Sequence, residues 1–497
     1  MNKRLRLNTI MGAINQIIVL VCGLILPKAI LNCYGSETNG LVNSISSILN
    51  VIALLEFGVG AVVQSTLYKP LAENDVEKIS KIYATAKRFF RIVGTVFLLY
   101  VIGVSIVYPI YQIKNFEFLF TFVLILALSV SFFAEYYFGL VNSLLLFADQ
   151  KNYIIYFIRS VTVIVNVIVS LILIHFKIQI QIVYIATAAI FLTRPIIYTI
   201  YTKKHYNLIK TKADQTALPQ KWDGLAQHIA AFVLDNTDII VLTIFGTLFD
   251  VSIYTVYYLV AKSLRNLIVS LTGGIQPYYG RLIAVNDYDK LKNDFNKYTF
   301  LITGLSVLCY SIAIMSIVPF VLVYTKGVTD TNYSQLAFGI LLLISQLVYT
   351  FRYSLNIVIM AAGRYKETKI SAIIEAVLNI IVSVVLVIFF GLIGVAIGTL
   401  VAMFFRMVYF TIFISKDIIK KSYLLIIKQL ILATPILILA ILLSIYKPFV
   451  VDNYWEWMKY TSLYALIILG CFIVINCIFN FKYLKQIVQK VCNRKRA

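Results

Sequence analysis

Charged side chains embedded in long apolar stretches are the residues of this sequence that could do chemistry. Two acids, Asp235 and Asp238, are three residues apart, and two cations, Lys262 and Arg265, follow with the same spacing. Residues three apart lie on the same side of a helix, so each pair would share one helix face. An ionised side chain at the centre of a membrane helix costs about 2.5–3.5 kcal/mol, so we expect these groups to meet a partner or a water-filled cavity. The chemistry that they indicate is the binding of an anion.

Two interpretations of these four side chains stay open. They could form structural ion pairs that allow two antiparallel helices to insert into the membrane. Alternatively, Lys262 and Arg265 bind an anionic substrate, and Asp235 and Asp238 set the charge of the site or couple an ion. A structural pair needs only one cation, and Asn266 adds a further polar group, so the pattern favours the second interpretation.

Further charged residues lie within apolar segments. Arg352 and Arg159 are candidates for additional substrate-binding cations, although both lie nearer segment ends, where long side chains can also reach lipid headgroups. Glu56 is a candidate coupling or charge-pairing acid, and Gly58 and Gly60 beside it allow close packing or bending. The other charged residues within these segments are Arg91, Glu135, Arg194, Glu375, Arg406 and Lys459.

The elements that must position these side chains are membrane helices. The 497 residues are 61% hydrophobic and 13% charged, with a mean hydropathy of +0.88, whereas a soluble chain is about 45–50% apolar and about 25% charged. A spanning helix needs about 20 apolar residues. The sequence predicts an all-α polytopic membrane protein with about fourteen spans. The predicted spans are 8–32, 39–66, 89–110, 117–147, 152–175, 179–202, 222–246, 251–275, 298–323, 333–361, 368–390, 392–415, 424–446 and 458–480.

The distribution of basic residues predicts the orientation. With a cytoplasmic N-terminus, the predicted cytoplasmic segments contain 31 Lys and Arg, and the predicted outer loops contain five. This asymmetry places both termini and the loops 67–88, 203–221 and 276–297 in the cytoplasm, and the loop 447–457 outside. The net charge of +22 is spread over short loops rather than clustered on a soluble face, which argues against nucleic-acid binding.

Two pairs of matching segments predict an internal repeat. Residues 72–79 and 284–291 share the pattern A-x-N-D-x-acid-K-aliphatic, and residues 142–148 resemble 356–362. Both matches are six spans apart, as expected for a parallel repeat about an axis along the membrane normal. The predicted parts are an N-lobe (1–210, spans 1–6), a C-lobe (211–420, spans 7–12), spans 13–14 (421–481) and a basic cytoplasmic tail (482–497). Alternatively, both loops independently use good helix-capping residues.

No catalytic motif is present, and we expect a carrier rather than an enzyme. The sequence has no phosphate-binding loop, and its six cysteines lack C-x-x-C spacing, so we expect no metal and no cofactor. The predicted outer loops are too short to form an active-site domain.

Several segments resemble a known family of membrane proteins. These are residues 34–41, 56–60, 67–73, 148–153, 236–240 and 251–254. Together with the layout of the whole chain, they resemble the polysaccharide-transporter (Wzx-type) lipid-linked oligosaccharide flippases. These flippases belong to the multidrug/oligosaccharidyl-lipid/polysaccharide exporter superfamily.

The resemblance implies two six-helix lobes that open alternately to either side of the bacterial plasma membrane. The implied cargo is an undecaprenyl-pyrophosphate-linked oligosaccharide moved to the outer leaflet for capsule, exopolysaccharide, O-antigen or teichoic-type synthesis. Membrane lipids, a polysaccharide polymerase and chain-length regulators are the implied partners. Related flippases use cavity arginines on the first, second and eighth spans, whereas here only the eighth carries central cations.

Two alternatives to a flippase remain. An ion-coupled multidrug exporter of the same superfamily would need an acidic cavity, for which Glu56 could serve. A non-transporting scaffold of polysaccharide assembly would use the charges within the membrane only structurally.

Overall fold

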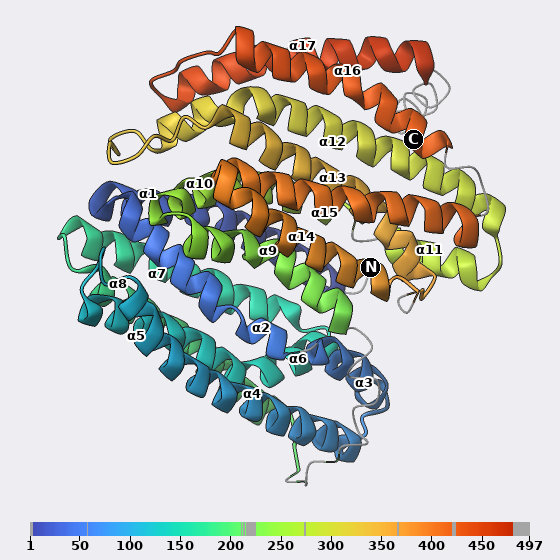
Figure 1. Ribbon diagram of the computed structural model, residues 1–497. Helices are drawn as coiled ribbons and strands as arrows, with labels where there is room; N and C mark the ends of the chain where they lie inside the picture. The colour runs from blue at the N-terminus through green and yellow to red at the C-terminus, as the bar shows by residue number, and fades with distance from the viewer. Residues whose placement is uncertain are drawn as a thin grey trace. The chain divides into compact units, whose positions relative to one another are not determined.

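The structure is a computed structural model that describes residues 3–56, 58–209, 211, 214, 225–272, 275–364, 367–419 and 424–480. Within these ranges all regular secondary structure is helical (Figure 1). The predicted basic tail, 482–497, and most of the connection between residues 210 and 224 lie outside the described residues.

The chain divides into two compact units, Met1–Ile240 and Val241–Ala497, with the boundary inside helix α9. The predicted lobe boundary near residue 210 and the predicted repeat stay predictions. The helices that begin in the first unit are α1 (Lys3–Leu49), α2 (Ile52–Leu55), α3 (Val59–Glu73), α4 (Val76–Tyr111), α5 (Phe118–Ala134), η1 (Glu135–Gly139), α6 (Leu140–Ala148), α7 (Asn152–His175), α8 (Ile180–His205) and α9 (Leu225–Phe245).

The second unit contains the remaining helices (Figure 1). They are α10 (Leu248–Ser270), α11 (Ile275–Ala284), α12 (Tyr288–Tyr324), α13 (Leu336–Ala361), α14 (Lys369–Phe390), α15 (Leu392–Phe413), η3 (Ile414–Ile418), α16 (Leu424–Tyr446) and α17 (Tyr454–Phe479).

The predicted all-α membrane fold is confirmed. In the part of the chain that is described, eleven helical stretches are long and apolar enough to cross a membrane. All fourteen predicted spans fall on helices, and the two counts differ for identifiable reasons. Helix α1 covers the first predicted span and part of the second, and α9 and α10 are not among the eleven stretches. Helices α9 and α10 carry the two charged pairs that opened the sequence analysis.

Helix α1 is two helices joined at a sharp kink. Gly35 has φ 83° and ψ 173°, a backbone conformation that is essentially restricted to glycine. The kink lies between the first two predicted spans. It joins them without an intervening loop.

Two segments predicted as loops are largely helical. Residues 67–88 contain the end of α3 and the first turns of α4, and residues 276–297 contain most of α11 and the start of α12. At about 1.5 Å per residue, the 36-residue α4 and the 37-residue α12 are longer than the roughly 30 Å hydrocarbon core. Their polar first turns can therefore extend beyond the membrane while remaining helical.

The repeated A-x-N-D motif has the same local structure at both places. Asn74 and Asn286 adopt left-handed backbone conformations, with φ 54° and 57°. Asp75 then caps α4 by accepting the backbone N–H of Lys78 at 3.0 Å, and Asp287 caps α12 in the same way. Helix capping is thus sufficient to explain this motif, so the motif by itself does not require a repeat.

Apolar side chains pack the helices of each unit. In the first unit, buried residues of α3, α4 and α6 form one core cluster, which includes Val63, Phe90 and Leu145. Other apolar side chains, such as Leu99, Val107 and Phe389, point outward and are more than 60% exposed. Such outward-facing apolar side chains are what a helix in contact with lipid requires.

Candidate functional site

Three neighbouring helices of the second unit bring two cations to one acid. Arg352 on α13 donates to Glu375 Oε1, and Arg406 on α15 donates to Glu375 Oε2 on α14. Glu375 is 0% exposed, and the two arginines are 7% and 5% exposed. Each carboxylate oxygen thus binds one guanidinium group, and the three residues form an ionic triad with more positive than negative charge.

Aromatic contacts connect the triad to α10. The guanidinium carbon of Arg352 lies 4.7 Å from the ring centroid of Tyr349, and that of Arg265 lies at the same distance from the same ring. Lys262 Nζ lies 5.3 Å from the ring centroid of Tyr258. Cations within about 6 Å of an aromatic ring face are attracted to it, so the tyrosines connect cations that would otherwise repel one another.

These residues form one cationic cluster, which we define as Lys262, Arg265, Arg352 and Arg406 with Glu375, Tyr258 and Tyr349. It brings together three of the predicted substrate-binding cations, Lys262, Arg265 and Arg352. Lys262 is half-buried, whereas Arg265 is 4% exposed. The cluster combines four cations with Glu375, and Lys262, Arg265 and Arg406 have further interactions within the protein. Cations gathered in this way can attract an anion.

Four members of the cluster are not among the site residues predicted from the sequence. Glu375 and Arg406 were noted only as charged residues within spans, and Tyr258 and Tyr349 were not noted. A usable signal existed for the tyrosines, because Tyr258–Lys262 and Tyr349–Arg352 have the four- and three-residue spacings of neighbours on a helix.

The predicted acids Asp235 and Asp238 lie on α9, within the first unit. Asp238 is buried and Asp235 is half-buried, and both take part in interactions within the protein. Asn236 between them accepts a hydrogen bond of 2.9 Å from Asn50 Nδ2. Their pairing with Lys262 and Arg265, which belong to the second unit, stays a prediction.

Glu56 and Arg159 also belong to the first unit. Glu56 is half-buried at the break between α2 and α3, where it interacts with Tyr136 of η1. A Cβ atom at Gly60 would meet the Glu56 carboxylate, so a larger residue there would require the Glu56 side chain to move. Arg159 is exposed on α7, near Arg194 of α8.

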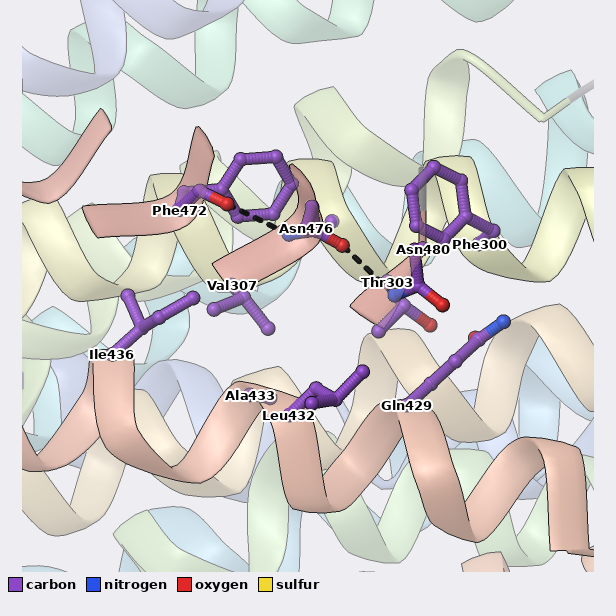
Figure 2. A pocket seen from close by; sticks show the side chains of 11 residues that line it. Phe300, Thr303, Val307, Gln429, Leu432, Ala433, Ile436, Phe472, Asn476 and Asn480 are labelled. Carbon is purple, nitrogen blue, oxygen red and sulfur yellow. Dashed lines mark hydrogen bonds between the residues drawn. The ribbon is translucent and has the colours of Figure 1, made fainter. Parts of the chain in front are cut away.

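A separate groove lies between α12, α16 and α17 of the second unit (Figure 2). Its empty volume is about 290 Å³, and no charged residue lines it. Asn480 Nδ2 donates to Asn476 Oδ1 at 3.0 Å, and Asn476 Nδ2 donates to the Phe472 carbonyl at 2.9 Å (Figure 2). This uncharged groove is not suited to bind a multiply charged anion, so the cationic cluster remains the candidate site.

Comparison with known proteins identifies the fold. No family model and no curated protein match the chain. Among solved structures, the lipid II flippase MurJ in an inward closed conformation has a TM-score of 0.69 and 16% sequence identity, covering 96% of this chain and 99% of its own. An inward-facing multidrug resistance MATE family transporter of the MOP superfamily has a TM-score of 0.58 and 14% identity, with coverages of 82% and 96%. An outward-facing structure of such a transporter has a TM-score of 0.55 and 14% identity, with coverages of 85% and 100%.

The chain has the fold that these solved structures share. The resemblance found in the sequence is therefore confirmed at the level of the fold. The MATE structures leave 15–18% of this chain uncovered while covering nearly all of their own length, whereas MurJ covers almost the entire chain. This MOP fold thus extends beyond the MATE architecture to a length similar to that of MurJ.

The structural neighbours are transporters and a flippase, in line with the expectation of a carrier rather than an enzyme. The apolar helices and these neighbours support a multi-pass membrane protein. Among the described residues, no group of three or more His, Cys, Asp or Glu is placed to hold a metal ion.

Proposed function

We propose that this protein is a flippase that moves a polyprenyl-pyrophosphate-linked oligosaccharide from the inner to the outer leaflet of the bacterial plasma membrane. The product would be used for the synthesis of a surface polysaccharide. The observation that carries this proposal is the cationic cluster, which lies in a MOP fold of the length found in the lipid II flippase MurJ.

The cluster has the chemistry that a pyrophosphate needs. A guanidinium group can bind two phosphate oxygens at once, whereas the ammonium group of a lysine acts as a point charge. Arg265 and Lys262 are the proposed ligands, and Arg352 adds positive charge behind Tyr349. Glu375 holds Arg352 and Arg406 in fixed positions, so the site is organised before the substrate arrives.

The acids of α9 have a proposed role when the site is empty. Asp235 or Asp238 would pair with Lys262 and Arg265, and substrate binding would exchange one anion for another. Because of this exchange, the cations would have an anionic partner within the membrane both with and without the substrate. Glu56 stays a candidate for coupling to an ion, and Arg159 a candidate for an additional cation in the first unit.

The proposed transport cycle is alternating access. The similar MATE transporters have been solved in inward-facing and outward-facing conformations, which supports a cycle of this kind for the same fold. In the proposed orientation, both termini are cytoplasmic, as the distribution of basic residues predicts.

The alternative of a multidrug exporter is less well supported. A carrier of organic cations needs an acidic site, whereas the cluster sets four cations against Glu375 and, in the proposed empty state, Asp235 or Asp238. A cluster of this sign would repel an organic cation.

Flipping of a labelled lipid-linked oligosaccharide in reconstituted vesicles tests the proposal. The variant with both Lys262→Gln and Arg265→Gln is expected to fold normally but to flip the lipid far more slowly. Arg265→Lys should also reduce flipping. This variant keeps the positive charge, but a lysine cannot form the bidentate contact of a guanidinium group with phosphate. Lys326→Gln, an exposed cation outside the cluster, is the matched control and should flip normally.

Three outcomes contradict parts of this proposal. A double variant that flips the lipid at the normal rate would show that these cations do not bind the substrate. A loss of folded protein in step with the loss of flipping would instead support structural ion pairs. A wild-type protein that exports organic cations but flips no lipid would favour the multidrug exporter, and a protein that transports neither would favour the scaffold.

A further inference from the structure

A basic groove runs along the N-terminal half of α4, in the first unit. Its empty volume is about 1000 Å³, and the residues that line it include Lys87, Arg88, Arg91, Ile92 and Val96. It is separate from the cationic cluster, which belongs entirely to the second unit. Nothing in the proposed transport mechanism uses it.

One end of this groove is strongly positive. Lys87, Arg88 and Arg91 lie within five residues, and no acidic residue lines the groove. Among the described residues, none of the three forms a salt bridge. In contrast, Lys78 and Lys81 earlier on the same helix are paired with Asp75 and Glu77 at 2.8 and 2.7 Å. The described residues thus form no ion pair with these three cations.

Aromatic rings orient two of these cations. Lys87 Nζ lies 5.6 Å from the ring centroid of Tyr83, and the guanidinium carbon of Arg91 lies 5.6 Å from that of Tyr137. Arg88 and Arg91 are exposed, so their polar groups are accessible to an anion.

The other end of the groove is apolar and faces outward. Ile92 and Val96 line it, and Leu99 continues the same surface one turn further on, where all three are exposed. From Arg88 to Leu99 the helix rises by about 16 Å at about 1.5 Å per residue. An occupant that matches both ends has an anionic head and a long apolar chain.

Thr211, which follows α8, also lines the groove. Two described residues on either side of it, Ile209 and Asp214, form hydrogen bonds with α4. The Ile209 backbone N–H donates to Ser80 Oγ at 3.0 Å, and the Asp214 backbone N–H donates to Thr85 Oγ1 at 2.9 Å. A molecule in the groove would therefore contact both α4 and the start of the connection that leads to α9.

We propose that this groove binds an anionic phospholipid of the surrounding membrane. Its phosphate lies among Lys87, Arg88 and Arg91, and its acyl chain lies along Ile92 and Val96. Clusters of basic residues at the membrane surface attract the anionic lipids of the cytoplasmic leaflet, which is where the predicted orientation puts the start of α4. In this position the lipid contacts Thr211 as well as α4.

Native mass spectrometry of the full-length protein, titrated with phosphatidylglycerol and with phosphatidylcholine, tests this site. The wild-type protein is expected to retain phosphatidylglycerol preferentially. The triple variant Lys87→Gln, Arg88→Gln and Arg91→Gln should bind phosphatidylglycerol at least about tenfold more weakly, because each cation near an anionic lipid contributes roughly a factor of five. The variant with Lys78→Gln and Lys81→Gln is the matched control, and its lipid preference should be unchanged.

A second measurement applies if the triple variant does not fold. Added salt should weaken the binding of phosphatidylglycerol to the wild-type protein but leave that of phosphatidylcholine unchanged, because salt screens exposed charges. Equal retention of both lipids by the wild-type protein would overturn the proposal. An unchanged preference in a folded triple variant would do the same, as would inorganic phosphate that binds as tightly as the lipid.

Discussion

Glu375 binds Arg352 through one carboxylate oxygen and leaves its second oxygen for a cation from another helix. Arg406 occupies that second position, so a single acid ties α13, α14 and α15 together. Removing this carboxylate would leave two buried guanidinium groups without the acid that each contacts, which is costly inside a protein.

Replacing this acid tests its structural role. Glu375→Gln is expected to lower the free energy of unfolding strongly, since removing one member of a buried ion pair costs about 3–5 kcal/mol. The measurement is the thermal unfolding of the purified protein in detergent. Glu367→Gln is the control, because Glu367 forms an exposed ion pair with Arg364 at 2.7 Å and its loss should change unfolding little. If Glu375→Gln and wild type unfold at the same temperature, the triad does not stabilise the fold.

Two cations contact the ring of Tyr349, and its removal should affect transport. In Tyr349→Leu, Arg265 and Arg352 lose the ring that each contacts at 4.7 Å, and their mutual repulsion is no longer offset. We expect flipping in vesicles to fall severalfold with the folded protein retained. Tyr349→Phe keeps the ring and should flip at nearly the wild-type rate. Equal flipping by the Leu and Phe variants would show that the ring has no part in the site.

The cap of α4 should depend on pH. Asp75 accepts the Lys78 N–H and pairs with the Lys78 ammonium group, and these interactions lower the pKa of the Asp75 carboxyl. Because its pKa in the folded protein is below that in the unfolded chain, Asp75 stabilises the fold above the unfolded pKa, about 3.9, and less as pH falls through the folded pKa.

Hydrogen exchange at the first amides of α4 measures this effect. Asp75→Asn keeps a capping side chain but removes the charge, so its α4 amides should exchange faster than those of wild type at pH 7. At a pH below the folded pKa, the two proteins should exchange alike, since both side chains are then neutral. If the exchange rates of the wild type and the Asp75→Asn variant differ equally at both pH values, the charge of Asp75 does not contribute to the cap.

Cysteine labelling tests the orientation. In a variant with the six native cysteines replaced, Lys326→Cys is expected to react with an impermeant thiol reagent added to intact cells, and Lys69→Cys only after lysis. The reason is the excess of Lys and Arg in the segments predicted to be cytoplasmic. Both side chains are exposed, so access does not limit labelling. Reaction of the Lys69→Cys protein in intact cells would show that the predicted orientation is wrong.

Local patterns predicted the helices better than the contacts between them. The apolar segments were visible along the sequence, and the shared face of Lys262 and Arg265 followed from their spacing. The contact of Arg352 with Glu375 joins residues 23 apart, and that of Arg406 with Glu375 joins residues 31 apart. Such pairs depend on which helices pack side by side, and periodicity within one helix does not determine this.

The loops show a second feature that could not be predicted from the sequence, namely where the helices end. The prediction of a loop at residues 67–88 rests on their place between two apolar spans, yet most of these residues are helical. Polarity indicates where a chain leaves the lipid, but it does not indicate where a helix ends. The ends here are set by backbone geometry, as Asn74 shows with its positive φ.

The kink at Gly35 restricts how the first two spans can move. A loop gives two helices slack, so that one can slide along its axis while the other stays in place. A junction of one residue has no such slack, and only the rotations about a few backbone bonds remain free. Any tilt of one part of α1 must then be matched by the other part, so the kink at Gly35 transmits rotation between the two spans but does not allow one to slide along the other.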